Sequence, residues 1–537
     1  GRNMPWWVLG ISMVATTFSA DTPNLVTDIV RTDGVSGNWV WWVMLLTGML
    51  TVFLFSRLWR RANIDTDLEF YEIRYSGKTA GFLRAFRALY LGFLINGFIM
   101  ATVSLAAIKI SGILLGLSPL QTILIAGGIT VIYSALGGLK SVLITDLIQF
   151  ILSISGAFFA AYYALNHPEV GGLNELLSHE SVRTKLNLLP ELENKSQWIS
   201  LILIPFAVQW WSTWYPGAEP GGGGYIAQRM LAAKNQNDSM YAVYLFNIVH
   251  YALRPWPWII VALASIIVFP EIKDIQSAFP GLAESSLGED LAYPAMLSFL
   301  PSGILGLVIT SLVAAYMSTI STHLNWGASY ITLDFYKRYL KQDSSEKELV
   351  WVGRISTLVL MLFSGVLALY LQNALKAFHV LLLIGAGTGL IYILRWFRKE
   401  IHAGAELAAM IISFLVAVYL EYLHPQLIGE ISSETKLLFG VGITTIGWLI
   451  VSVFFGKNKE SDWKSFLKRM DLDEKSLKKN MGIKLMAMLL SCAAVYSALF
   501  TTGYLIYGWI NNALVSALVL LISLFGIYKL WKRVLIS

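Results

Sequence analysis

The chain has 537 residues, of which 56% are hydrophobic and 14% are charged, and its mean hydropathy is +0.61. Soluble domains carry about 25% charged residues, so this composition excludes an ordinary soluble protein and indicates an all-α polytopic membrane protein. The single cysteine, Cys492, excludes a disulfide framework and a cysteine metal site. The net charge of +6 is informative only through its distribution.

Apolar segments of about 20 residues, the length of a membrane-spanning helix, recur along the chain. They predict about fourteen spans, at residues 5–30, 38–57, 83–112, 118–137, 141–165, 199–231, 240–268, 301–333, 350–372, 376–397, 402–423, 436–456, 484–508 and 512–532.

The connections between these spans alternate in charge. One set is basic and includes Arg229 with Lys234 and the segment 457–484, whereas the other set, including 166–197 and 271–301, is acidic or neutral. By the positive-inside rule the basic loops are expected to be cytoplasmic, in a plasma (inner) membrane. The 457–484 loop is expected to lie near anionic lipid, and nothing in it suggests nucleic acid.

The first predicted span contains small and hydroxylated residues and is then interrupted. Asp21, Pro23 and Asn24 predict a break in this helix, with a proline kink near the outer interface as the alternative. The chain begins at Gly1 without an initiator methionine, directly before this span, and shows no signal peptide. We therefore expect the natural N-terminus, with one further helix, to precede it.

The fifth and seventh spans each carry charged side chains. Asp146 lies about one and a half turns into the fifth span, where it faces either protein or a cation. His250 and Arg254 are four residues apart and so share one face of the seventh span. Arg254 needs a partner there, which is either Glu219 in a structural pair or an oxygen of a substrate.

The sixth span is interrupted between Tyr215 and Gly224 by two prolines and five glycines, with Glu219 among them. These residues lower helix propensity, and broken helices occur at membrane depth only against protein or a water-filled cavity. Corresponding interruptions in two halves of a chain are typical of inverted-repeat transporters. The break is therefore a candidate binding site, with a glycine-rich surface loop as the alternative.

The eighth span contains a dense group of hydroxyls, at Ser318, Thr319, Ser321 and Thr322. Hydroxyl and carbonyl oxygens suit a hard monovalent cation such as sodium. The alternative is that these hydroxyls bond to carbonyls of their own helix. In the tenth span, the glycines of 385–389 predict a bend or close packing against a neighbour. The spans beyond residue 400 are interpreted as scaffold.

Four motifs resemble the sodium/solute symporter family. They are Gly1-Arg-Asn-Met-Pro-Trp-Trp leading into Ser12–Ala20, Gly137-Gly-Leu-Lys with Thr145-Asp-Leu-Ile-Gln149, Gln228-Arg-Met-Leu-Ala-Ala-Lys234, and Ala315–Thr322 followed by Thr332-Leu-Asp-Phe-Tyr-Lys337. The resemblance implies a LeuT-like fold of two inverted five-helix repeats with broken first and sixth helices, followed by about four C-terminal helices. The expected divisions are a first repeat at 1–165, an extracellular loop at 166–198, a second repeat at 199–399 and a scaffold at 400–537. The resemblance also implies that the family's usual helix before the Gly-Arg motif is absent here.

The resemblance also implies site residues. The main sodium site falls on the carbonyls of Ala15, Phe18 and Ala315 and the hydroxyls of Ser318 and Thr319. A possible second sodium site falls on Asp146, Ser318, Ser321 and Thr322. The substrate positions depart from those of sugar-carrying members, and the candidates are Asp21, Trp41, Glu219, His250 and Arg254.

The expected function is sodium-coupled import of a small polar solute (a sugar, sugar derivative, organic acid or amino acid) by alternating access. The solute, sodium ions and the lipid bilayer are the expected partners. The alternatives are a non-transporting sensor of the same fold and a channel. We find no nucleophile–base pair or metal cluster with the spacing of an enzyme.

Overall fold

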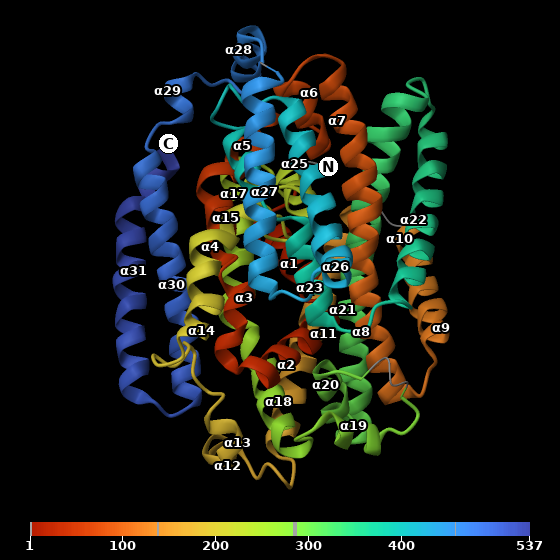
Figure 1. Ribbon diagram of the computed structural model, residues 1–537, viewed down its shortest axis with the longest axis vertical. Helices are drawn as coiled ribbons and strands as arrows, with labels where there is room; N and C mark the ends of the chain where they lie inside the picture. The colour runs from red at the N-terminus through yellow and green to blue at the C-terminus, as the bar shows by residue number, and fades with distance from the viewer. Residues whose placement is uncertain (1–2, 137–138, 283–286, 457, 537) are drawn as a thin grey trace.

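A computed structural model describes residues 3–136, 139–282, 287–456 and 458–536 (Figure 1). The motif positions Gly1, Arg2, Gly137 and Gly138 lie outside the described residues. Those that are described form helices and connecting segments, with a single isolated bridge between Met4 and Ala233. The fold class is therefore all-α, as predicted.

The first five predicted spans fold into eleven helices with short 3₁₀ and π segments between them. The helices are α1 (Trp6–Thr17), α2 (Asp21–Asp33), α3 (Trp39–Trp42), α4 (Leu45–Leu50), α5 (Ser56–Ala62), α6 (Phe70–Arg74), α7 (Gly77–Leu89), α8 (Asn96–Leu115), α9 (Pro119–Thr122), α10 (Gly128–Leu136) and α11 (Leu139–Leu165). The short helix α6 lies in the connection between the second and third spans.

The next five spans and their connections contain thirteen helices. They are α12 (Leu173–Ser178), α13 (Glu180–Arg183), α14 (Lys195–Gln197), α15 (Trp210–Ser212), α16 (Gly224–Ala232), α17 (Gln236–Ile248), α18 (Pro255–Val268), α19 (Ile272–Ala278), α20 (Ala292–Leu297), α21 (Ser302–Ser329), α22 (Glu346–Ala368), α23 (Ala374–Ile384) and α24 (Gly389–Leu394). A π-helical segment, η8 (Val249–Leu253), joins α17 to α18. The bend predicted at the glycines of 385–389 is confirmed by the gap between α23 and α24.

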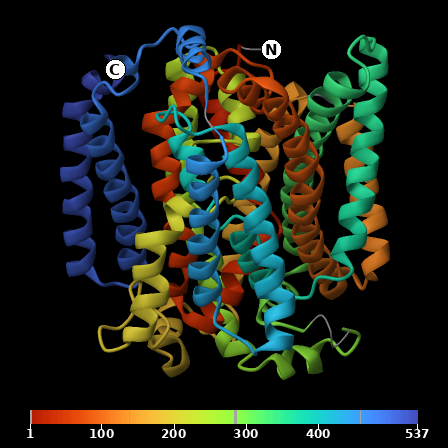
Figure 2. The same ribbon diagram turned by 45° about the horizontal axis from the view of Figure 1, so that its top comes forward.

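The C-terminal part contains seven helices. They are α25 (Ala403–Val418), α26 (His424–Leu427), α27 (Ser433–Phe454), α28 (Glu460–Arg469), α29 (Glu474–Leu477), α30 (Met481–Ile506) and α31 (Ile510–Ile536). The pair α30 and α31 packs together at one edge of the molecule (Figures 1 and 2).

Within the described residues, ten helical stretches are long and apolar enough to cross a membrane. The other predicted spans are the first and sixth, which are broken, and the fourth and tenth, which are short apolar helices. The protein is therefore a multi-pass membrane protein.

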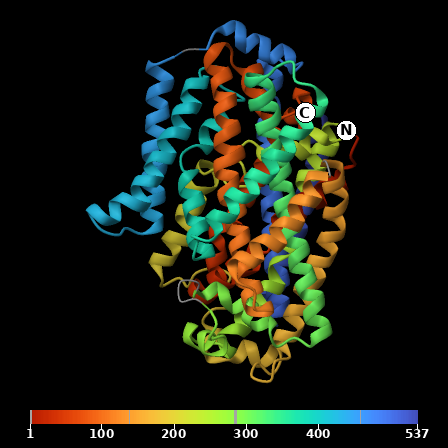
Figure 3. The same cartoon turned by 90° about the vertical axis from the view of Figure 1, so that its right-hand side faces the viewer.

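The two sets of connections lie at opposite ends of the bundle. In Figures 1 and 3, α6 and α28 lie at the end where the chain termini are also found, whereas α12, α13 and α19 lie at the other. The connections that contain α6 and α28 therefore share one end.

Candidate functional site

The first helix break lies between α1 and α2, at residues 18–20. The sequence placed the interruption a few residues later, at Asp21, Pro23 and Asn24, and this placement is wrong. Asp21 starts α2, and Pro23 falls in the first turn of that helix. The N–H groups of the first turn make no hydrogen bond within the helix, so a proline is tolerated there. At the break, the N–H of Phe18 donates to the carbonyls of Val14 and Ala15, over 2.8 Å and 3.2 Å.

The second break lies between Ser212, the last residue of α15, and Gly224, the first of α16. This agrees with the predicted interruption. Gly217, Gly221, Gly222 and Gly224 all have positive φ, which side chains other than glycine rarely adopt. The helix is interrupted here because glycine readily adopts this run of conformations.

The backbone groups freed at this break find partners in neighbouring segments. The indole of Trp59 donates to the carbonyl of Gly221 over 2.8 Å, and the N–H of Gly224 donates to Asp67 over 3.0 Å. The N–H of Trp214 donates over 3.2 Å to Gly385, at the bend of the tenth span. A broken helix is tolerated here because protein groups satisfy it.

The eighth span, α21, packs against α1 beside the first break. The hydroxyl of Thr319 donates to the carbonyl of Thr16 over 2.8 Å and to that of Ala315, in its own helix, over 3.1 Å. The five residues expected to form the main sodium site, Ala15, Phe18, Ala315, Ser318 and Thr319, are all at most 2% exposed. The arrangement thus collects neutral oxygens from α1 and α21 in a buried place.

The next face of α21 contacts a charged cluster. Asp146, on α11, accepts hydrogen bonds from Ser12 and from Ser318, the latter over 2.7 Å. The guanidinium of Arg229 lies 3.7 Å from the same carboxylate and donates to Thr322 over 2.8 Å. A fixed cation therefore sits where the sequence predicts a second sodium ion.

Arg229 is the main functional residue that sequence reasoning placed wrongly. Its grouping with the basic connections is wrong, because its side chain is fully buried in α16. Ser321, predicted as a further ligand, donates to the carbonyl of Ser318 in its own helix over 3.1 Å. The Gln228-Arg sequence was a signal for Arg229, but an arginine within one turn of a helix end can lie in the helix interior or in the connection.

A small cavity of about 80 Å³ lies between the two breaks. Four of the five predicted substrate residues line it, namely Asp21, Trp41, His250 and Arg254, together with hydroxyl and aromatic side chains that the sequence did not single out, including Thr17, Ser19, Tyr215, Tyr225 and Tyr251. Glu219 is not among its lining residues. Drug-sized ligand sites measure about 300–1,000 Å³, so this conformation is a compact one that must open to admit a solute.

Arg254 is held at the cavity by neutral groups. It donates to the carbonyl of Thr17, and its Nη2 lies 3.1 Å from Nε2 of His250. Nδ1 of His250 in turn lies 3.0 Å from the hydroxyl of Thr17. Among the described residues no carboxylate lies within 4.0 Å of Arg254, so the pair with Glu219 considered from the sequence does not form.

The remaining cavity residues provide a polar acceptor and aromatic faces. One oxygen of Asp21 is buried and has no hydrogen-bond partner among the described groups. The ring of Trp41 stacks on Tyr251, with centroids 5.8 Å apart, and meets His250 edge-on. Its indole N–H is already bonded to Asn38 over 2.9 Å, which fixes the ring.

Comparison with known proteins identifies the group to which this architecture belongs. The model of the sodium:solute symporter family matches residues 1–413. The chain belongs to this family. It is therefore a sodium-coupled solute symporter and not an enzyme.

Individual relatives are distant. The chain is 25% identical over 440 residues to the sodium/glucose cotransporter of Vibrio parahaemolyticus, an alignment that covers 79% of this chain and 78% of that protein. It is 24% identical over 463 residues to sodium/glucose cotransporter 1 of Ovis aries, covering 78% of this chain and 66% of that one. It is 26% identical over 391 residues to sodium/myo-inositol cotransporter 2 of Homo sapiens, covering 68% and 55%.

Among solved structures, the fold is similar to that of a Na⁺-coupled sialic acid symporter in a substrate-bound, outward-open state. The TM-score is 0.63 at 19% identity, covering 86% of this chain and 92% of the other. This similarity supports the fold, which is of the LeuT-like transporter type.

Proposed function

We propose that this symporter imports a small organic acid that also carries hydrogen-bond donors, such as a sugar acid, together with one sodium ion. The observation that carries the proposal is the charge of Arg254, which faces the cavity with neutral hydrogen-bond partners only. Arg254 is 2% exposed and makes no ion pair with a described carboxylate, since Asp21 in the same cavity lies beyond 4.0 Å. A buried charge without a counter-ion in contact is costly. A carboxylate on the solute would supply that counter-ion and form charge-assisted hydrogen bonds.

The other cavity groups support a solute with hydroxyl or ammonium donors. The unpartnered oxygen of Asp21 is an acceptor for such a donor. The faces of Trp41, Tyr215 and Tyr225 suit the apolar side of a compact ring. A sugar acid satisfies all three requirements, and an amino acid satisfies the first two.

For sodium, we propose the oxygens of Ala15, Phe18, Ala315, Ser318 and Thr319. Ser318 uses its proton in the bond to Asp146, which leaves lone pairs of its oxygen for a cation. The bond from Thr319 to Thr16 joins α1 to α21 at this level. Sodium would replace that bond with stronger contacts and so couple the position of α1 to ion binding.

We propose a single sodium ion because the second predicted site already contains a cation. The charge of Asp146 is balanced by Arg229, and its oxygens accept from Ser12 and Ser318. A sodium ion there would have to displace a buried guanidinium. The remaining ligand, Ser321, faces its own helix.

The proposed direction follows from the gradient. With the basic loops in the cytoplasm, the inward sodium gradient across the plasma membrane would drive uptake. The two inverted repeats, residues 1–165 and 199–399, would move relative to each other about the site between the breaks.

The test is sodium-driven uptake by purified protein in liposomes, offered a sugar acid, the corresponding neutral sugar and an amino acid. We expect sodium to accelerate uptake of an acid and not of the neutral sugar. Replacing Arg254→Gln should lower the apparent affinity for the acid about 10–100-fold, the value of a lost charge-assisted bond. The proposed substrate class would be overturned if the protein took up the neutral sugar in preference to the acid and Arg254→Gln left that preference unchanged.

A further inference from the structure

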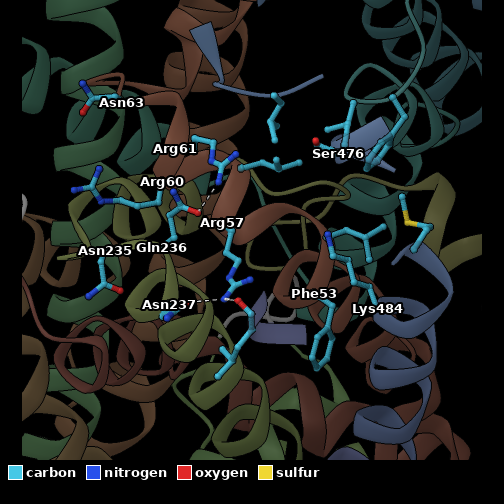
Figure 4. Close-up of a pocket in the computed structure, with 17 residues that line it drawn as sticks. Phe53, Arg57, Arg60, Arg61, Asn63, Asn235, Gln236, Asn237, Ser476 and Lys484 are labelled. Atoms are coloured by element: carbon cyan, nitrogen blue, oxygen red, sulfur yellow. Dashed lines mark hydrogen bonds between the residues drawn. The ribbon is translucent and has the colours of Figure 1, made fainter. Parts of the chain in front are cut away.

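A second and larger cavity, of about 660 Å³, opens at the end of the bundle that carries the basic connections (Figure 4). It lies where α5, the start of α17, α29 with the start of α30, and the last turn of α31 meet. We call it the basic pocket, because Arg57, Arg60, Arg61 and Lys484 line it. None of its lining residues is an Asp or Glu.

Arg57 and Arg61 donate to neutral oxygens. Arg57 donates to the carbonyls of Val534 and Leu535, each over 3.0 Å, and to the side chain of Asn237. Its Nε is buried and has no partner among the described groups. Arg61 approaches the carbonyl of Asp471 at 3.3 Å. These bonds hold the guanidinium groups of Arg57 and Arg61 in place without an ion pair to either of them among the described residues.

Lys484 adds a third positive charge from the opposite wall, as Figure 4 shows. Its ammonium lies within electrostatic range of both Arg57 and Arg61. Within the described part of the chain, the ammonium of Lys484 makes no salt bridge or hydrogen bond, and Arg57, Arg61 and Lys484 form no ion pair. Like charges gathered in a half-enclosed cavity repel one another, so an anion that enters gains from all of them.

The neutral groups of the pocket are suited to the oxygens of a phosphate. Ser476 contributes a hydroxyl, and Asn235 and Gln236 contribute side-chain amides. Asn235 and Gln236 stand at the N-terminal end of α17, a helix of 13 residues, whose dipole favours negative charge. Arginine groups and a lysine around such donors are the usual surroundings of a phosphate.

The position of the pocket suggests where that phosphate comes from. Arg57 is in the last two turns of the apolar stretch Val35–Ala62, and Lys484 is in the first turn of α30. Both side chains therefore stand at the level where an apolar helix meets the membrane surface. The outer faces of α30 and α31 beside them expose large apolar side chains such as Leu485 and Tyr528. Basic pockets between helices at this level are typical binding places for anionic headgroups.

We propose that the basic pocket binds a phosphate group, and in the membrane the phosphate of an anionic lipid headgroup. The bound headgroup would neutralise Arg57, Arg61 and Lys484 and join α5 and α17 of the transport core to α30 and α31. This site lies apart from the cavity between the helix breaks, and its occupancy can be measured without any transported solute.

The experiment titrates purified protein, in neutral detergent, with short-chain phosphatidylglycerol and follows its apparent melting temperature. A ligand that binds the folded state alone raises this temperature by mass action. Short-chain phosphatidylcholine, which has the same phosphate beside a quaternary ammonium, is the zwitterionic comparison with no net charge. Glycerol 3-phosphate and inorganic phosphate test a soluble source of the same group.

Two variants and one matched control decide the result. Lys484→Gln removes a charge without breaking any recorded bond, and Arg61→Gln removes a second charge. Each variant should raise the concentration of phosphatidylglycerol needed for half-saturation about fivefold. Lys479→Gln, the same change at an exposed residue outside the pocket, should leave it unaltered.

If glycerol 3-phosphate raises the melting temperature as much as phosphatidylglycerol does, at a similar concentration, the phosphate site is supported and its ligand is a soluble phosphate ester. The proposal would be overturned if the half-saturating concentration of phosphatidylglycerol were the same in the unsubstituted protein and in both pocket variants. An equal response to phosphatidylglycerol and phosphatidylcholine would also overturn it. Counting co-purified anionic lipids by native mass spectrometry provides a second readout, in which Lys484→Gln should retain fewer than Lys479→Gln.

Discussion

Two neighbouring residues of α21 show how one polar stretch serves two purposes. The hydroxyl of Thr319 faces the first helix break and bonds to the carbonyl of Thr16, among neutral oxygens. The hydroxyl of Ser318, one residue earlier, bonds to Asp146, whose charge is balanced by Arg229. Successive helix residues point about 100° apart, so adjacent hydroxyls reach different neighbours. The environment of Thr319 is suited to a mobile cation, to which Ser318 can also offer its lone pairs, whereas the carboxylate bonded to Ser318 already has a fixed cation beside it.

The largest expected effect comes from removing that fixed cation. Arg229→Gln leaves Asp146 buried and uncompensated, which should lower the free energy of unfolding by about 3–5 kcal/mol. The measurement is the apparent melting temperature in detergent. The double variant Arg229→Gln with Asp146→Asn should recover most of the loss, because it removes both charges. A single variant as stable as the starting protein would contradict the pairing.

The next largest effect is expected at the neutral face. Thr319→Ala removes a proposed sodium ligand and should raise the sodium concentration for half-maximal uptake about tenfold. Ser321→Ala is the matched control, since its hydroxyl bonds to its own helix, and should change that concentration less than about twofold. If both variants behave alike, the division of α21 into two faces is wrong.

A smaller effect distinguishes the two carboxylates near the breaks. Asp21 lines the cavity, whereas Glu219 does not. Asp21→Asn should therefore weaken the apparent affinity for the solute about fivefold to tenfold, because the amide oxygen still accepts the hydrogen bond and only the assistance of the charge is lost. Glu219→Gln should alter it less than about twofold. Uptake measured over a range of solute concentrations separates these outcomes, and the reverse order would place Glu219 in the binding site.

Much of the fold could be predicted from the sequence, because hydropathy and helix-breaking residues act locally. The second break follows from Pro216, Pro220 and the glycines after them. The sequence predicts the break in the first span a few residues too late, because Pro23 suggests the interruption. Proline is well tolerated in the first turn of a helix, which is where Pro23 lies.

The site was predictable only in part, because contacts between distant helices decide it. Asp146 and the hydroxyls of 318–322 stand out as polar residues in apolar spans. Nothing local in the sequence shows that Arg229 turns inward towards Asp146, or that Glu219 turns away from the cavity. Both depend on the path of the chain through the glycine-rich break, which has no period from which a direction can be read.

The central claim is that one sodium ion accompanies one organic anion, because Arg229 replaces a second ion. The most direct test is the effect of membrane potential on sodium-driven uptake of a monovalent acid in liposomes, with potentials set by valinomycin and potassium. One sodium ion with one anion moves no net charge, so an inside-negative potential of about 100 mV should leave the accumulation ratio unchanged. Two sodium ions would move one net charge, worth about 2.3 kcal/mol at that potential, and would raise the ratio about fiftyfold. An increase of that size would contradict the account.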